Sequence, residues 1–368
     1  MLLQKPAFLL FYHARAAEAS FGEWLGVLWH GLSLDCTVAG YVTAFPVLVA
    51  LASFWIPLSQ RVWRIVLTVY FSLIALVTAA IFAVDLNLYG YWGFRLDGSV
   101  LIYLSDPGEA LASASWGEVL RQILIMLVYA GAMIWSYRWI LRLFRVEPVP
   151  LRGRIVPTVA TLLIGGLTFL AIRGGVTVAT ANVSKVYFSS NMFLNHAATN
   201  PVFSFLSSVG DNENYAEAYP FFEEERRKTL FEELRGNRPG ADAGTPRLLR
   251  SDRPNVVLIL LESFGRTIMD ETVNGEPVMP NMQRFKREGV WFENFFANSF
   301  RTDRGQVAVL CGFPAQTTMS IMKLPRKSAT LPSLARSLGR EGYRSVFMYG
   351  GDLNFTNQAS FMYSTGWE

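Results

Sequence analysis

Long uncharged stretches dominate the first half of the chain. Four of them lie between charged residues, at 36–60, 65–84, 122–137 and 155–172. A helix rises about 1.5 Å per residue, so it needs roughly 20 mostly apolar residues to cross a hydrocarbon core about 30 Å thick. The second stretch reaches this length, and arginines at the ends of the shorter two can extend to the lipid headgroups. The pattern therefore predicts four membrane-spanning helices.

A shorter apolar run, residues 6–12, precedes these stretches. It is too short to span, and three interpretations are open: part of a first membrane helix, a remnant of a signal peptide, or a short helix on the membrane surface. For the long stretches, the alternative is buried helices of a large soluble protein. So many stretches so close together disfavour that alternative.

The arginines between the stretches predict an orientation. The loop 138–154 carries five arginines and one acid, and the loop 57–64 carries two arginines and no acid. Short loops rich in Arg and Lys remain on the cytoplasmic side of a membrane. We therefore expect the chain from about residue 174 onward to lie outside the cytoplasm.

Beyond residue 174 the hydropathy falls and the pattern changes. Residues 219–235 predict an amphipathic helix, and residues 236–254 have the Gly-, Pro-, Arg- and Asp-rich composition of a linker. Further along, apolar runs alternate with helical patterns, which predicts strands at 256–261, 289–296 and 344–349 and helices at 303–310 and 331–341. This order predicts an α/β domain with a doubly wound sheet, in which ligands collect beyond the carboxyl ends of the strands.

The expected organisation is a transmembrane domain over 1–173, an extracytoplasmic linker with an amphipathic helix over 174–253, and the α/β segment over 254–368. The chain is 51% hydrophobic and 17% charged, and its net charge is +4. Membrane-flanking arginines account for this excess, and no basic run has interleaved aromatics, so we expect no nucleic-acid partner. Cys36 and Cys311 are too far apart in this organisation to be expected to form a disulfide.

Two polar residues follow expected strands. Glu262 comes directly after six apolar residues, where an ionised carboxylate costs several kcal/mol unless it is paired or metal-bound. Thr302 stands where a strand passes into a helix, and the free N–H groups of a helix N-terminus favour phosphate. The alternatives are an exposed acid at the edge of the sheet and an ordinary N-cap threonine.

Together these segments resemble a known family. Residues 255–264, 298–314 and 343–357 resemble, in the same order and behind membrane helices, the membrane-anchored sulfatase-like transferases of the lipoteichoic acid synthase family. That family belongs to the alkaline phosphatase superfamily. The resemblance implies that Glu262 is a metal ligand and that Thr302 is both the nucleophile and a metal ligand. It implies a fold with a multi-pass helical membrane domain followed by the N-terminal part of an alkaline-phosphatase-like, sulfatase-like α/β domain.

The resemblance also implies a two-step reaction at a bacterial inner (plasma) membrane. Thr302 would take a phosphoglycerol or phosphoethanolamine group from a membrane phospholipid, and an envelope glycan or lipid would accept it from the phospho-threonine intermediate. The oxygen ligands Glu262 and Thr302 favour Mn²⁺ or Mg²⁺ over Zn²⁺. Asp352 and Asn357 are expected to bind the substrate. The basic residues of these segments are expected to balance phosphate charge unless they are simply solvated, namely Arg301, Arg304, Arg326 and Lys327.

The chain also departs from the family. The arginine of the family's headgroup segment is not matched at 355–358, and the downstream Asp-His pair and histidine of the family have no counterpart, because His13, His30 and His196 all precede residue 255. We therefore expect the chain to be a fragment that lacks the C-terminal half of its catalytic domain. Two alternatives stay open: a sulfatase or phosphoesterase hydrolase, and a catalytically silent membrane-anchored binding protein. Thr302 disfavours the sulfatase, because threonine cannot become formylglycine.

Overall fold

A computed structural model describes the chain except for residues 99, 102–114, 146–149, 210–220, 236–250 and 317–318. Most of the Gly- and Pro-rich run 236–254 lies outside the described residues, and so do residues 219 and 220 of the predicted amphipathic helix. The described chain forms two compact units. Unit 1 comprises Met1–Asn212 and Val307–Glu368, and unit 2 comprises Glu213–Gln306.

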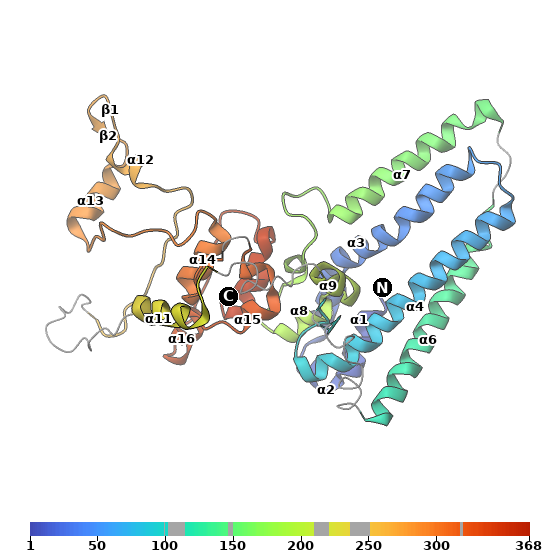
Figure 1. The fold of residues 1–368 in the computed structure, drawn as a ribbon, viewed down its shortest axis with the longest axis horizontal. Coiled ribbons are helices and arrows are strands. Elements are labelled where there is room, and N and C mark those ends of the chain that lie inside the picture. The colour runs from blue at the N-terminus through green and yellow to red at the C-terminus, as the bar shows by residue number, and fades with distance from the viewer. Residues whose placement is uncertain (99, 102–114, 146–149, 210–220, 236–250, 317–318) are drawn as a thin grey trace. The chain divides into compact units, whose positions relative to one another are not determined.

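Four long apolar helices of unit 1 confirm the predicted spans. They are α3 (Phe21–Ser53), α4 (Gln60–Trp92), α6 (Trp116–Leu141) and α7 (Ile155–Arg173), the last preceded by the 3-10 turn η2 (Leu151–Gly153) (Figure 1). Each is long and apolar enough to cross a membrane. The protein is therefore a membrane protein.

The four helices run antiparallel. Thr37, in the middle of α3, donates a hydrogen bond of 3.0 Å to the carbonyl of Ala171, near the end of α7, and Trp55, just after α3, donates one of 3.1 Å to Thr158, near the start of α7. Tyr91, at the end of α4, donates one of 2.7 Å to Glu118, at the start of α6. At the opposite ends, Val49 of α3 packs with Trp63 of α4. The segments that follow α4 and α7 therefore emerge on the same side.

The first span begins earlier than predicted. We expected its apolar stretch to start after the charge of Asp35, but α3 begins at Phe21, where Ser20 and Glu23 form a capping box. Asp35 is buried inside the helix, 2.6 Å from the ammonium of Lys5 and 2.8 Å from the side-chain amide of Asn200. These partners compensate the carboxylate, so the charge does not end the helix.

Short helices complete the core of this unit. The apolar run 6–12 lies in α1 (Gln4–Phe11), which is followed by α2 (His13–Ala16). Phe8 and Leu9 of α1 are buried among residues of α3, α4 and α8 (Met192–Ala198), so this run packs inside the unit and does not lie on its surface. Helix α9 (Pro201–Ser208) also packs against α3 and α4.

The C-terminal segment of unit 1 is helical. It contains the second half of α14 (Thr302–Cys311), then η4 (Ile321–Lys323), α15 (Pro325–Ala329), α16 (Leu334–Arg340), η5 (Phe355–Asn357) and α17 (Gln358–Thr365). Helices α14 and α16 confirm the two helices predicted here. Cys311 packs in a small core with Val307, Met322 and Phe361, and neither cysteine forms a disulfide.

Two hydrogen bonds tether this segment to the membrane-spanning part of the unit. The backbone N–H of Ser360 donates to the hydroxyl of Ser184 in η3 (Val183–Val186) at 3.1 Å. The side chain of Asn182 donates to the carbonyl of Asn354 at 2.8 Å.

Unit 2 contains α11 (Glu224–Arg235), α12 (Arg266–Asp270), the strands β1 (Thr272–Val273) and β2 (Glu276–Pro277), and α13 (Pro280–Glu288). The strands form an antiparallel hairpin that pairs Thr272 with Pro277. Its turn, Asn274-Gly275, has positive φ at both residues, as a two-residue hairpin turn requires. Helix α11 confirms the helical part of the predicted amphipathic segment.

The three predicted strands of the α/β segment are not paired into a sheet among the described residues. Residues 256–261 are extended, but their side chains are between 40% and 83% exposed, and residues 289–296 form no ladder either. A buried strand needs hydrogen-bonded neighbours and covered faces, and these runs have neither. The third run comes closest: Ser345 and Phe347 share two backbone hydrogen bonds with Glu368, in the pattern of a parallel pair.

Candidate functional site

Glu262 and Thr302 lie in direct contact in unit 2. The hydroxyl of Thr302 donates a hydrogen bond to one carboxylate oxygen, Oε2, of Glu262. The hydroxyl of Ser263 contacts the other oxygen, Oε1, at 3.3 Å. The two predicted site residues, 40 positions apart in the sequence, thus come together.

Local backbone geometry positions both residues. Ser263 has a φ of 53°, a left-handed conformation that is uncommon outside glycine, and it ends the extended run directly after Glu262. Thr302 is the first residue of α14, whose first turn is closed by a hydrogen bond of 2.9 Å from Gly305 N to Arg301 O. The first N–H groups of a helix have no acceptor within the helix, so this end favours an anion next to the Thr302 hydroxyl.

The expected burial of Glu262 is wrong for the described residues. The apolar run that precedes it is exposed, and Glu262 and Thr302 are exposed as well. The cost of a buried carboxylate is therefore no reason to place a metal here. The observation that still supports a functional site here is the direct contact of the Glu262 carboxylate with the Thr302 hydroxyl.

The oxygen atoms of Glu262 and Thr302 are of a type that binds a hard divalent cation, but they are too few to complete its coordination shell. A carboxylate oxygen and a hydroxyl oxygen in contact are ligands that Mg²⁺ and Mn²⁺ accept. Magnesium takes about six ligands, and in the part of the chain that the structure describes no third His, Cys, Asp or Glu joins them. Glu262 and Thr302 could therefore supply part of a metal site.

The predicted substrate residues fall in both units. Arg304 lies in the first turn of α14, 5.8 Å from the ring of Phe300. Asp352 and Asn357 belong to unit 1. Asp352 caps a turn, accepting hydrogen bonds of 2.9 and 3.0 Å from the backbone and side chain of Asn354. Asn357 is 9% exposed and has a left-handed φ of 64°, and its side-chain amide contacts the carbonyl of Lys323 at 3.4 Å.

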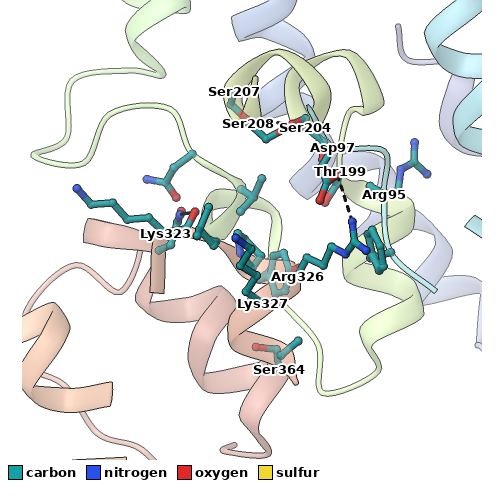
Figure 2. A pocket seen from close by; sticks show the side chains of 18 of the residues that line it. Arg95, Asp97, Thr199, Ser204, Ser207, Ser208, Lys323, Arg326, Lys327 and Ser364 are labelled. Atoms are coloured by element: carbon teal, nitrogen blue, oxygen red, sulfur yellow. Dashed lines mark hydrogen bonds and ion pairs between the residues drawn. The ribbon is translucent and has the colours of Figure 1, made fainter. Parts of the chain in front are cut away.

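Unit 1 also contains a pocket that the sequence did not predict (Figure 2). Its volume is about 1210 Å³, and it lies among the segment after α4, the segment after α7, helix α9 and the C-terminal helices. Arg326 of α15 crosses it to reach Asp97, 3.5 Å away, and stacks on the ring of Phe94 at 4.2 Å. The sequence signal that could have indicated it is the aromatic pair Trp92 and Phe94, directly after the second apolar stretch.

Comparisons with known proteins agree with the resemblance. Residues 254–368 match the family model described as Sulfatase. Phosphoglycerol transferase I of Xanthomonas campestris pv. campestris (strain B100) is 36% identical over 124 residues, which cover 32% of this chain and 17% of that protein. Lipoteichoic acid synthase 1 of Bacillus subtilis (strain 168) is 32% identical over 127 residues, 31% of this chain and 19% of that protein. The match thus spans less than a fifth of each relative's length, and no solved structure matches.

These matches confirm the predicted family and fold class, although the strands are unpaired among the described residues. The Sulfatase match covers the segment that contains Glu262, Thr302, Asp352 and Asn357, and the four apolar helices precede it. Residues 254–368 therefore form a sulfatase-like segment, similar to parts of phosphoglycerol transferase I and lipoteichoic acid synthase 1, and they follow four apolar helices.

Proposed function

We propose that this protein transfers a phosphoglycerol group from a membrane phospholipid to an acceptor in the cell envelope, with Thr302 as the nucleophile. The observation that carries the proposal is the hydrogen bond from the Thr302 hydroxyl to the Glu262 carboxylate at the start of a helix. The names of the relatives, phosphoglycerol transferase and lipoteichoic acid synthase, favour phosphoglycerol over phosphoethanolamine.

In the first step, Oγ1 of Thr302 attacks the phosphorus of the lipid headgroup. The Glu262 carboxylate accepts the hydroxyl proton as the new P–O bond forms, the P–O bond to diacylglycerol breaks, and the departing oxygen takes a proton from water to give diacylglycerol. In the second step, a hydroxyl of the acceptor attacks the phospho-threonine and restores the threonine. The N–H groups at the start of α14 and the guanidinium of Arg304 stabilise charge on the phosphoryl oxygens in both steps.

A divalent cation, Mn²⁺ or Mg²⁺ rather than Zn²⁺, would be held in part by Glu262 and Thr302. When bound, it would lower the pKa of the threonine hydroxyl and neutralise phosphate charge. Asp352 and Asn357 are the proposed contacts of the headgroup. The setting that fits this chemistry is a bacterial plasma membrane with the chain beyond residue 174 outside, where lipid and envelope acceptor meet.

The test is a transfer assay with fluorescent phosphatidylglycerol on the full-length membrane-bound protein that contains this chain. We expect Thr302→Ala to abolish release of labelled diacylglycerol, a loss of at least about 10³-fold, because no other group replaces an absent nucleophile. Thr302→Ser keeps a hydroxyl at the same position and should retain part of the activity. As a control, Thr229→Ala removes an exposed threonine hydroxyl from α11 of unit 2.

Mass spectrometry distinguishes the two-step route from direct hydrolysis. Rapid acid quenching should trap phosphoglycerol on the peptide that contains Thr302 in the wild-type protein and not in Thr302→Ala. Release of diacylglycerol at the wild-type rate by Thr302→Ala would refute the assignment of the nucleophile. Absence of release from the wild-type protein, with the metal supplied, would favour the catalytically silent alternative.

A further inference from the structure

The pocket of unit 1 carries an excess of positive charge. Among its described lining residues, five are cationic and one is acidic, namely Arg95, Lys323, Arg326, Lys327 and Arg336 against Asp97. His196 also lines the pocket, but burial, aided by the charges of Arg95 and Arg15, lowers its pKa to about 3, so it is neutral near pH 7. The pocket therefore favours an anion.

Three of these cations already have partners in the structure. Arg95 is buried and lies 3.0 Å from the carboxylate of Asp85. Arg326 pairs with Asp97, as the dashed line in Figure 2 marks. Arg336 donates to three backbone carbonyls, those of Ala329, Leu331 and Ser364. These contacts fix the three guanidinium groups as walls of the pocket.

The ammonium groups of Lys323 and Lys327 are different. Neither pairs with a carboxylate in the part of the chain that the structure describes, and both are exposed residues that line the pocket. Lys323 ends η4 and Lys327 lies in α15, so both come from the same short segment of the chain. Two unpaired ammonium groups beside fixed guanidinium groups are the charge pattern that binds phosphate.

The pocket also offers partners for a polyol or an amine attached to that phosphate. The side-chain oxygen of Asn357 is buried and accepts no hydrogen bond from the described residues, although a buried acceptor normally has a donor. Asn357 lies next to Lys323, whose carbonyl its amide contacts. A ligand that places phosphate on the lysines can therefore donate a hydroxyl or an ammonium hydrogen to Asn357.

The position of the pocket along the membrane-spanning helices indicates where such a ligand comes from. Trp92, the last residue of α4, lines the pocket, as does the segment that follows α7, and these two helices end on the same side. Trp92 and Phe94 stack on each other, with ring centroids 5.4 Å apart. Tryptophan at the end of an apolar span marks the level of the lipid headgroups. A phosphate in the pocket therefore lies at the depth of phospholipid phosphates.

We propose that this pocket is a binding site for the phosphate headgroup of an anionic phospholipid, with Lys323 and Lys327 as the principal phosphate contacts. The site is built from residues of unit 1 alone, whereas Glu262 and Thr302 belong to unit 2. Because Asn357 is also a headgroup contact in the proposed function, this proposal rests on that function in the choice of ligand, but binding to the lysines can be measured without any transfer. The same chemistry would suit a soluble phosphate ester, and the membrane depth of the pocket favours the lipid.

The test is a binding titration of the full chain in detergent micelles with short-chain dioctanoyl phosphatidylglycerol. The double variant Lys323→Gln/Lys327→Gln should bind about tenfold more weakly or worse, which corresponds to about 1.4 kcal/mol. The matched control, Lys228→Gln/Lys286→Gln, removes two exposed lysines of unit 2 and should leave binding unchanged. Thr302→Ala should also bind as the wild type does, which separates this proposal from the proposed reaction.

Three further measurements identify the ligand. Dioctanoyl phosphatidylcholine, which carries no net charge, should bind more weakly than phosphatidylglycerol, and added salt should weaken the binding of phosphatidylglycerol. Glycerol phosphate at the same concentration should not displace the lipid. Full displacement by glycerol phosphate would overturn the assignment to a lipid, and equal binding of phosphatidylglycerol to the double variant and the wild type would overturn the site.

Discussion

The ion pair between Lys5 and Asp35 should be essential to the stability of the membrane-spanning part. Their charged atoms lie 2.6 Å apart, and their side chains are only 2% and 7% exposed. Asn200 donates a further hydrogen bond of 2.8 Å to the same carboxylate. The pair thus joins α1, α3 and the start of α9 in the core of unit 1. Burial lowers the pKa of Lys5, and the charge of Asp35 opposes this effect.

The expected effect of a single substitution is large. Asp35→Leu leaves a buried ammonium without its carboxylate, and Lys5→Met leaves a buried carboxylate with only Asn200. Removal of one partner of a buried pair costs about 3 to 5 kcal/mol, because the remaining charge is no longer compensated. The double variant Lys5→Met/Asp35→Leu buries two apolar side chains of similar size, and it should recover at least half of that loss.

Unfolding in detergent micelles, followed by tryptophan fluorescence, measures these losses. A matched control is Arg344→Met, which breaks an ion pair with Glu368 at the same distance of 2.6 Å, but with side chains 75% and 47% exposed. Such exposed pairs contribute less than about 1 kcal/mol. If Asp35→Leu cost no more than the control, or if the losses of the two single variants were additive in the double variant, the reasoning would be refuted.

Two other groups give further predictions. Burial lowers the pKa of His196 from 6.5 to about 3 on folding. As the pH falls below about 6.5, the unfolded chain therefore binds a proton that the folded chain does not, and the free energy of unfolding decreases. The decrease is about 2 kcal/mol at pH 5. Unfolding at pH 7.5 and pH 5 should show this loss, and His196→Gln should reduce it; an unchanged pH dependence would contradict the assignment. Burial raises the pKa of Cys311 to about 11, so iodoacetamide at pH 8 should alkylate this thiol far more slowly in the folded protein than after denaturation. Equal rates would show that the small core around Cys311 opens freely.

The membrane-spanning architecture was predictable because it depends on local composition. An uninterrupted apolar stretch of sufficient length identifies a span without knowledge of its neighbours, and all four helices were found in this way. The start of α3 was not predictable, because the partners that allow Asp35 to stay inside it are distant in sequence. Asn200, for instance, is 165 positions away.

The contact between Glu262 and Thr302 followed from the family's motif order, and their catalytic and metal-binding roles stay predictions. The pairing of the predicted strands could not be predicted in the same way. A run such as 256–261 indicates a preference for extended structure, but it does not identify the neighbouring strands that would complete a sheet. The pocket was missed for a related reason. Its lysines come from one end of the chain and its aromatic residues from another, so no local pattern contains both.

The tether from Asn182 and Ser184 to Asn354 and Ser360 has a kinetic consequence. It holds the C-terminal helices of unit 1, and with them the lysines of the pocket, at the membrane surface. A lipid then reaches these residues by diffusing sideways within the leaflet, without leaving it. The quantity that governs such encounters is the mole fraction of the anionic lipid in the surface, so dilution with neutral lipid slows them even when the total lipid concentration is constant.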